Sequence, residues 1–216
     1  MLFSKSITFD DEGIGRAAVS SDVDARRNAE IAFVEKLKEG DELAFETLVE
    51  RYSGDIYGLL YRLTENAEEA ADLTQDTFLR AVRAIKSFRG ESGLKTWLFR
   101  IAINESRNRH RWWKRRRRSE TISLDATIGG TEQRVEDTLA DTSISPEESA
   151  LMREREQALS LALLELAEPY REAIVLCDVE GLSYEETANA LGIGLGTVKS
   201  RISRGREELR RNLKDL

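Results

Sequence analysis

The feature that most constrains the fold lies in residues 182–211, where two short amphipathic segments are separated by a glycine-rich break. Ser183 followed three residues later by Glu186 is a capping box, which predicts that a helix begins there. Gly192 and Gly194 predict the end of that helix, and a second helix follows almost immediately. Two helices joined by so tight a turn are typical of a helix-turn-helix.

The second helix of this motif is predicted to have one apolar and one polar face. By helical spacing, the apolar face holds Val198, Ile202, Gly205 and Leu209. We expect Ala188 and Gly192 to let the two helices approach. Hydroxyl and basic side chains on the other face can donate to phosphates and to guanine edges. These candidate DNA-binding residues are Thr197, Lys199, Ser200, Arg201, Ser203 and Arg204. A basic helix end is also commonly a solvated surface, but contact with a DNA groove requires such residues directly after the turn.

Three further helices are predicted upstream. Apolar residues recur at steps of three and four through residues 45–63, and Asn66 is placed to cap a second helix over residues 66–88. The apolar side of that second helix is Ala70, Leu73, Phe78, Val82 and Ile85. Two glycines then break the chain before a third helix, which runs from residue 94 to the tryptophans. Its buried residues are expected to be Leu94, Leu98 and Ile101.

The third helix carries a second basic surface. Arg100, Asn104, Arg107 and Arg111 step by four, three and four, so they form one stripe apart from the apolar side. The stripe continues into "RNRHRWWKRRRR", residues 107–118. An asparagine can bond a base edge, and tryptophans can stack on an unpaired base, so this combination suits partly melted DNA. For Trp97, a place in the core is an equally good interpretation.

The formal net charge of the chain is −7, which contrasts with these two basic surfaces. Residues 119–157 hold ten acidic residues against three arginines, a local net charge of −7, so the acidity is concentrated there. We therefore expect an all-α protein of two small helical domains. The expected boundaries are a flexible arm at 1–28, a domain at 29–118, an acidic linker at 119–146, and a helix-turn-helix domain at 147–216.

Several classes of site are disfavoured by composition. The chain has one histidine and one cysteine, so no zinc site or His/Cys catalytic set is expected, and we expect no cofactor. No apolar run has the length of a signal peptide core or a membrane span, which favours a cytoplasmic protein without membrane insertion. Asp72 and Asp76 could share a metal, as in a metal-dependent hydrolase, but hard metals bind several oxygens. With Gln75, they better fit a docking surface for a basic partner, or a solvated face.

Three stretches resemble bacterial extracytoplasmic-function sigma factors, the two-domain initiation subunits of RNA polymerase. They are "DLTQDTFLRAVRAIKSFRG", "KTWLFRIAINESRNR" and "GLSYEETANALGIGLGTVKSRISRGREELR", in the family's order and at family-like spacing. The resemblance covers residues 30–113 and 147–211. It implies a protein without enzymatic activity that binds core RNA polymerase and promoter DNA, with an anti-sigma factor as a further partner. A helix-turn-helix regulator with an N-terminal sensing domain is the alternative, although it leaves the Asn/Arg/Trp stripe without a role.

The resemblance also implies roles for individual residues. The residues implied to recognise and open the minus-ten promoter element are Lys95, Trp97, Arg100, Asn104, Arg107, Asn108 and Arg111. The minus-thirty-five element would be met by the polar face of the last helix. The surface implied to dock on the largest catalytic polymerase subunit is Asp72, Gln75, Asp76 and Phe78. Three positions depart from the family pattern: Thr187 stands where a large aliphatic residue is usual, Gly205 where alanine is common, and Leu94 where the promoter loop frequently has an aromatic residue.

Overall fold

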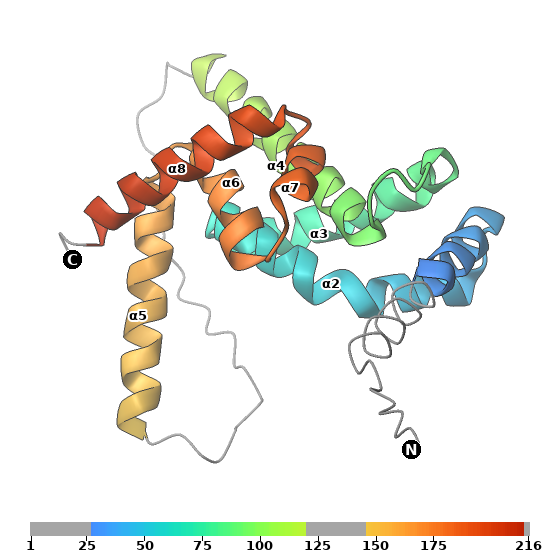
Figure 1. Ribbon diagram of the computed structural model, residues 1–216, viewed down its shortest axis with the longest axis horizontal. Helices are drawn as coiled ribbons and strands as arrows, with labels where there is room; N and C mark the ends of the chain where they lie inside the picture. The colour runs from blue at the N-terminus through green and yellow to red at the C-terminus, as the bar shows by residue number, and fades with distance from the viewer. Residues whose placement is uncertain (1–26, 120–145, 214–216) are drawn as a thin grey trace, which may run out of the picture.

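The computed structural model describes residues 27–119 and 146–213, which contain helices and no strand (Figure 1). Residues 27–39 are helical. The remaining elements are α2 (Glu42–Thr64), α3 (Ala67–Ala84), the 3₁₀ helix η1 (Ile85–Ser87), α4 (Leu94–Ser119), α5 (Pro146–Glu165), α6 (Glu168–Ile174), the π-helix η2 (Val175–Val179), α7 (Tyr184–Leu191) and α8 (Leu195–Asn212). The expected all-α architecture is confirmed. The expected N-terminal arm and acidic linker lie almost entirely outside the described residues.

The N-terminal domain is built on α2, which packs against α3 and α4. Asn66 caps α3 as predicted, because its side chain accepts a hydrogen bond of 2.9 Å from the Glu69 amide. The predicted apolar side of α3 is wrong at Val82, which is 45% exposed. The small residues Thr77 and Ala81 are buried in its place, so the buried stripe passes beside Val82. Helix α3 also ends at Ala84, before the predicted end.

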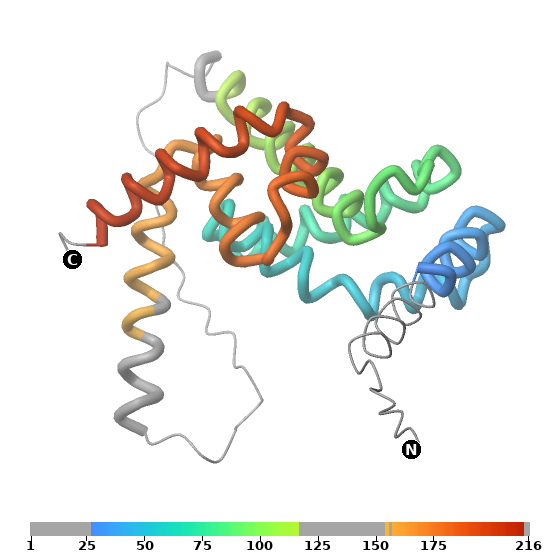
Figure 2. The backbone as a smooth tube through the Cα atoms, viewed as in Figure 1, coloured from blue at the N-terminus to red at the C-terminus, as the bar shows by residue number. Residues whose placement is uncertain are grey.

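The helix over residues 27–39 was not among the predicted elements. It buries Val34 and Leu37 against the domain core, whereas Ile31 is 54% exposed. Figure 2 shows this helix at the start of the coloured tube, beside the first part of α2. The spacing of three between these apolar residues is a helical signal. This signal is short and weak, so the sequence pattern alone did not reveal the helix.

The predicted helix-turn-helix is present in α7 and α8. Both hydrogen bonds of the Ser183–Glu186 capping box are formed, and Gly192 ends α7 with a left-handed φ of 66°. The expectation that Gly192 lets the helices approach is wrong, because a Cβ there would meet nothing within 4 Å. The close approach occurs instead at Gly205, where a Cβ would lie 2.8 Å from Cγ1 of Ile174. Helix α8 therefore packs tightly on α6 through a position that has no side chain.

Helix α5 projects from the rest of the molecule (Figure 1). Its C-terminal end packs against α2 and α8, where Ala162 and Leu163 are buried. The two domains also touch directly, because α7 packs on α4 and α6 packs on α2. The basic stripe of α4 consequently lies beside the C-terminal domain.

Candidate nucleic-acid interface

The outer face of α4 presents four of the predicted minus-ten residues to solvent, three of which belong to the stripe. They are Arg100, Asn104, Asn108 and Arg111. Arg111 donates a 2.6 Å hydrogen bond to Oδ1 of Asn108, which fixes the asparagine side chain within the stripe. Beyond it, Trp112 and Trp113 are 43% and 46% exposed and meet edge to face. Cations, an amide and aromatic faces are thus combined on one exposed surface, as binding of unpaired nucleic acid requires.

Two other predicted residues of this set have partners within the N-terminal domain. Lys95 pairs with Asp55 at 2.7 Å, and Nζ lies 5.2 Å from the centre of the Phe99 ring. Trp97 is half-buried and packs on Phe88, with ring centres 5.1 Å apart. Trp97 therefore supports the loop before α4 from within. This agrees with the interpretation that places Trp97 in the core.

Arg107 is the stripe residue that the structure places differently, because it faces the C-terminal domain. Its Nε and Nη2 donate to the two carboxylate oxygens of Glu172 at 2.6 and 2.5 Å, and Nη1 donates to the Leu191 carbonyl at 3.4 Å. The Glu172 side chain is only 5% exposed, compared with 26% for Arg107. The hydrogen bonds to Glu172 raise the pKa of Arg107 above its ordinary value, so the guanidinium stays charged in this bidentate contact.

Two further arginines join the domains. Arg171 of α6 donates from Nη1 to the Leu63 carbonyl in the last turn of α2, at 2.9 Å. Burial lowers the pKa of Arg171. The guanidinium nevertheless remains protonated, as arginine does in proteins. Arg62 of α2 pairs with Glu180 at 3.3 Å. These contacts and the Arg107–Glu172 pair are hereafter called the domain contact.

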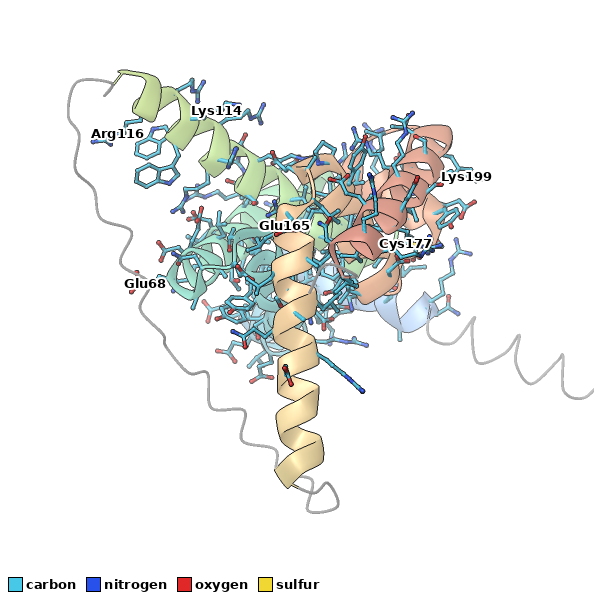
Figure 3. The ribbon with its side chains drawn as sticks, turned by 90° about the vertical axis from the view of Figure 1, so that its left-hand side faces the viewer. Glu68, Lys114, Arg116, Glu165, Cys177 and Lys199 are labelled. Carbon is cyan, nitrogen blue, oxygen red and sulfur yellow. The ribbon has the colours of Figure 1, made fainter. Side chains whose placement is uncertain are left out.

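The second candidate surface is the polar face of α8. Five of its six predicted residues, Thr197, Lys199, Ser200, Ser203 and Arg204, are exposed. Arg201 is half-buried. Figure 3 shows Lys199 on α8 well apart from Lys114 near the end of α4. The molecule thus presents two separate basic surfaces, one on each domain.

The predicted docking residues all lie on α3, and three of the four are exposed. Asp72, Gln75 and Asp76 are exposed, but Phe78 is 8% exposed and belongs to the core, because it lies on the side of α3 that packs within the domain. Arg109 of α4 donates to Asp76 at 3.0 Å and lies 3.8 Å from Asp72. Asp72 and Asp76 therefore share Arg109 as a cationic partner.

Two apolar residues extend this surface and were missed by the sequence pattern. Leu79 and Val82 are 56% and 45% exposed on α3, within one to two turns of the acidic residues. An exposed apolar pair beside carboxylates is a typical protein-binding surface. The surface formed by Asp72, Gln75, Asp76, Leu79 and Val82 is hereafter called the α3 surface.

Within residues 27–119 and 146–213, no three His, Cys, Asp or Glu side chains are grouped as a metal site would need. No helix in these ranges is both long and apolar enough to cross a membrane.

Comparison with known proteins identifies the family. Residues 48–118 match Sigma-70 region 2, and residues 156–209 match Sigma-70 region 4. The RNA polymerase sigma-H factor of Pseudomonas aeruginosa is 39% identical over 183 residues, which are 85% of this chain and 93% of that protein. The ECF RNA polymerase sigma factor SigW of Bacillus subtilis is 38% identical over 85% of this chain and 96% of that protein.

The chain belongs to the extracytoplasmic-function sigma factors. As a sigma factor, it acts with RNA polymerase in promoter recognition and is not an enzyme. The alternative of a regulator with a sensing domain is wrong, because region 2 occupies the N-terminal half. The Asn/Arg/Trp stripe and the α3 surface both fall within the region 2 match.

Solved structures agree with this assignment. The sigma factor RpoE of Bartonella quintana, in complex with the anti-sigma factor NepR, is 29% identical, with a TM-score of 0.61 over 79% of this chain and 96% of that one. CnrH in complex with the cytosolic domain of CnrY shares the fold, with a TM-score of 0.62 over 87% of this chain and 98% of that one. The fold of this sigma factor is therefore that of its structural neighbours.

Proposed function

We propose that the sigma factor reads a promoter through two separate surfaces. The exposed stripe of α4, with Arg100, Asn104, Asn108 and Arg111, contacts the minus-ten element, and the polar face of α8 contacts the minus-thirty-five element. The observation that supports this most is that the two basic, exposed surfaces lie on different domains, 29–118 and 147–216. Asparagine and tryptophan accompany the cations on α4, which suits unpaired bases, whereas a helix after a tight turn suits a duplex groove.

Engagement of both promoter elements requires the domain contact to open. Arg107 belongs to the α4 stripe by spacing, yet its guanidinium is held by Glu172 and the Leu191 carbonyl. A phosphate would have to replace this carboxylate as the partner of Arg107. We infer that the described arrangement is the free protein, and that polymerase holds the domains apart in the promoter complex.

The α3 surface is proposed to dock on the largest catalytic subunit of core RNA polymerase. Leu79 and Val82 supply exposed apolar area, and Asp72 and Asp76 supply negative charge beside it. Arg109 neutralises part of that charge in the free protein. A basic partner helix would compete with Arg109 for the same carboxylates.

An anti-sigma factor is proposed as a further partner, in keeping with the complex of the Bartonella quintana relative with NepR. We place the protein in the cytoplasm, where RNA polymerase and the chromosome are found. The proposed roles need no cofactor, because hydrogen bonds and charge alone account for contact with DNA and polymerase.

Docking is tested by binding of the full chain to purified core polymerase. Leu79→Asp should weaken binding about tenfold or more, since burial of a leucine contributes about 1.5–3 kcal/mol. Leu43→Asp is the matched control, because Leu43 is 71% exposed on α2 and does not belong to the α3 surface. Equal binding by both variants would contradict docking through α3.

A further inference from the structure

The start of α4 is capped by a residue that is distant in the sequence. The backbone amide of Leu94, the first residue of α4, donates a 2.6 Å hydrogen bond to Oε1 of Glu30. Glu30 lies in the helix over residues 27–39, and 64 residues separate the two positions. The first turn of α4 contains no acidic residue of its own. The Glu30 carboxylate therefore satisfies a free helix amide and opposes the positive end of the helix dipole.

The contact is made at the end of a short loop, residues 88–93, that leads into α4. Gly90 has a left-handed φ of 72°, and the Gly93 carbonyl accepts the first bond of α4, from the Trp97 amide at 3.1 Å. Leu94 itself is completely buried. A Cβ at Gly93 would lie 3.8 Å from Oε1 of Glu30, which is an ordinary van der Waals distance, so the Glu30 carboxylate lies directly beside this end of the loop.

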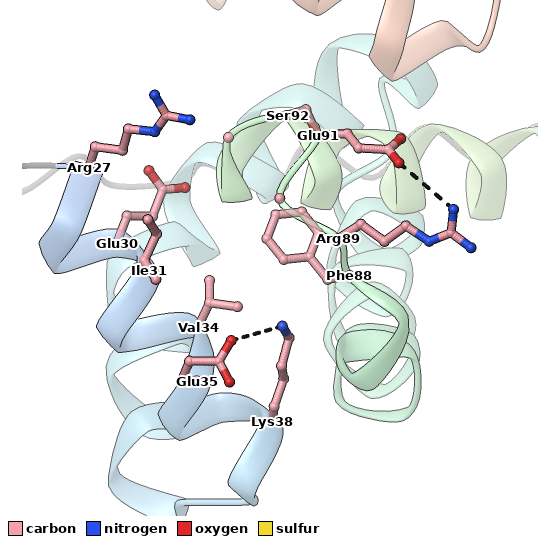
Figure 4. A pocket seen from close by; sticks show the side chains of 12 residues that line it. Arg27, Glu30, Ile31, Val34, Glu35, Lys38, Phe88, Arg89, Glu91 and Ser92 are labelled. Atoms are coloured by element: carbon pink, nitrogen blue, oxygen red, sulfur yellow. Dashed lines mark hydrogen bonds and ion pairs between the residues drawn. The ribbon is translucent and has the colours of Figure 1, made fainter. Parts of the chain in front are cut away.

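The loop is held from two sides. On one side Phe88 packs on Trp97, and on the other the helix over residues 27–39 lines a groove of about 570 Å³ against the loop (Figure 4). In Figure 4 the Glu30 carboxylate points to the loop, while Glu35 pairs with Lys38 further along the same helix. Glu30 therefore anchors the loop by a directed hydrogen bond.

The orientation of this loop decides where its exposed side chains point. Arg89 and Glu91 are 83% and 80% exposed and lie 3.9 Å apart at its tip. The loop runs directly into the α4 face proposed to contact the minus-ten element. A helix start that loses its cap frays in the first turn, and such a change would move the loop relative to Arg100.

We propose that Glu30 is a positioning residue for minus-ten recognition, which holds the 88–93 loop and the start of α4 in one orientation. This inference rests on the proposed role of the α4 face. Glu30 itself does not contact DNA in this account. Its removal changes which bases are preferred near the loop and leaves docking on polymerase and the minus-thirty-five preference unchanged.

The test is run-off transcription by full-length sigma factor with core polymerase on promoters whose minus-ten element is randomised. Glu30→Ala should lower transcription from the preferred element about fivefold, as expected for the loss of one helix cap, and flatten the preference at the positions nearest the loop. Glu30→Gln keeps an acceptor oxygen and should retain most of the wild-type preference. Glu35→Ala is the matched control, because Glu35 lines the same groove, is itself exposed, and among its described contacts pairs only with Lys38 of its own helix.

A uniform loss at every minus-ten sequence, or an identical effect of Glu35→Ala, would overturn the proposal. So would a Glu30→Ala variant with the wild-type preference. If Glu30→Ala lowers the melting temperature of the whole protein, Glu30→Gln decides the outcome. The proposal then requires Glu30→Gln to retain the base preference that Glu30→Ala loses. A wild-type protein without any minus-ten preference would instead contradict the proposed function of α4, so the two failures are distinguishable.

Discussion

Replacement of Glu172 by alanine should weaken the domain contact strongly. Glu172 is 5% exposed and accepts two hydrogen bonds from Arg107. Its loss therefore leaves the Arg107 guanidinium at a buried site from which its carboxylate partner has been removed. Removal of one partner from a buried ion pair typically costs about 3–5 kcal/mol. The Arg107 side chain keeps 26% exposure and the Leu191 carbonyl as an acceptor, so we expect about 3 kcal/mol.

The coupling between the two residues is measured by a double-mutant cycle in the full chain. Arg107→Ala should cost about as much as Glu172→Ala, because it leaves the carboxylate buried and unpaired, whereas the double variant leaves no unpaired charge. The free energy of unfolding in urea, followed by helical circular dichroism, should therefore show a coupling of about 2–3 kcal/mol. Additive effects within about 0.5 kcal/mol would refute the reasoning, because residues on separated domains do not couple.

The same pair should limit binding of DNA by the free protein. Glu172→Gln removes the charge that holds Arg107, so single-stranded minus-ten DNA should bind about fivefold tighter at low salt, as for one added charge-assisted contact. Glu165→Gln makes the same charge change at the last residue of α5, which is exposed, and should have little effect. If both variants bind equally tightly, general acidity is responsible and not the domain contact. The acidic linker would then be the better explanation.

Three further predictions concern the C-terminal domain. Thr187→Val should stabilise the protein by about 1 kcal/mol in thermal unfolding, because the buried Thr187 hydroxyl has no hydrogen-bond partner among the described residues and valine has the same shape. Ser183→Ala should destabilise it by about 1 kcal/mol, since the N-cap of α7 is lost. If Arg204 reads a base edge, Arg204→Ala should cost about 1–3 kcal/mol and relax preference at one minus-thirty-five position, whereas Arg201→Ala should weaken all sequences alike. Equal effects on matched and mismatched duplexes would contradict the last assignment.

Local signals in the sequence were sufficient for most of the helices. The capping box at Ser183 and the cap at Asn66 are hydrogen bonds between residues three apart, so sequence spacing alone indicates them. The polar face of α8 was also predictable, since a helix of known phase exposes the residues opposite its apolar side. The same reasoning placed Arg107 on the α4 stripe.

The partner of Arg107 could not be predicted in this way. Periodicity shows which face of a helix a residue occupies, but Glu172 lies 65 residues away in another domain. The α3 surface was partly missed for a similar reason: the sequence gives no sign that small Ala81, rather than Val82, faces the core. Glu30 gave no signal either, because a cap from a separate helix leaves no spacing pattern beside Leu94.

The measurement that tests the central claim most directly is run-off transcription from a pool of promoters, with core polymerase and the full-length chain. We expect specific transcripts only when both proteins are present, from promoters that share two elements at one fixed spacing. Substitution of Arg100 and Asn104 should abolish the dependence on the downstream element, and substitution of Arg204 should affect only the upstream one. Transcripts that are the same with core polymerase alone, or that share no common elements, would contradict the account.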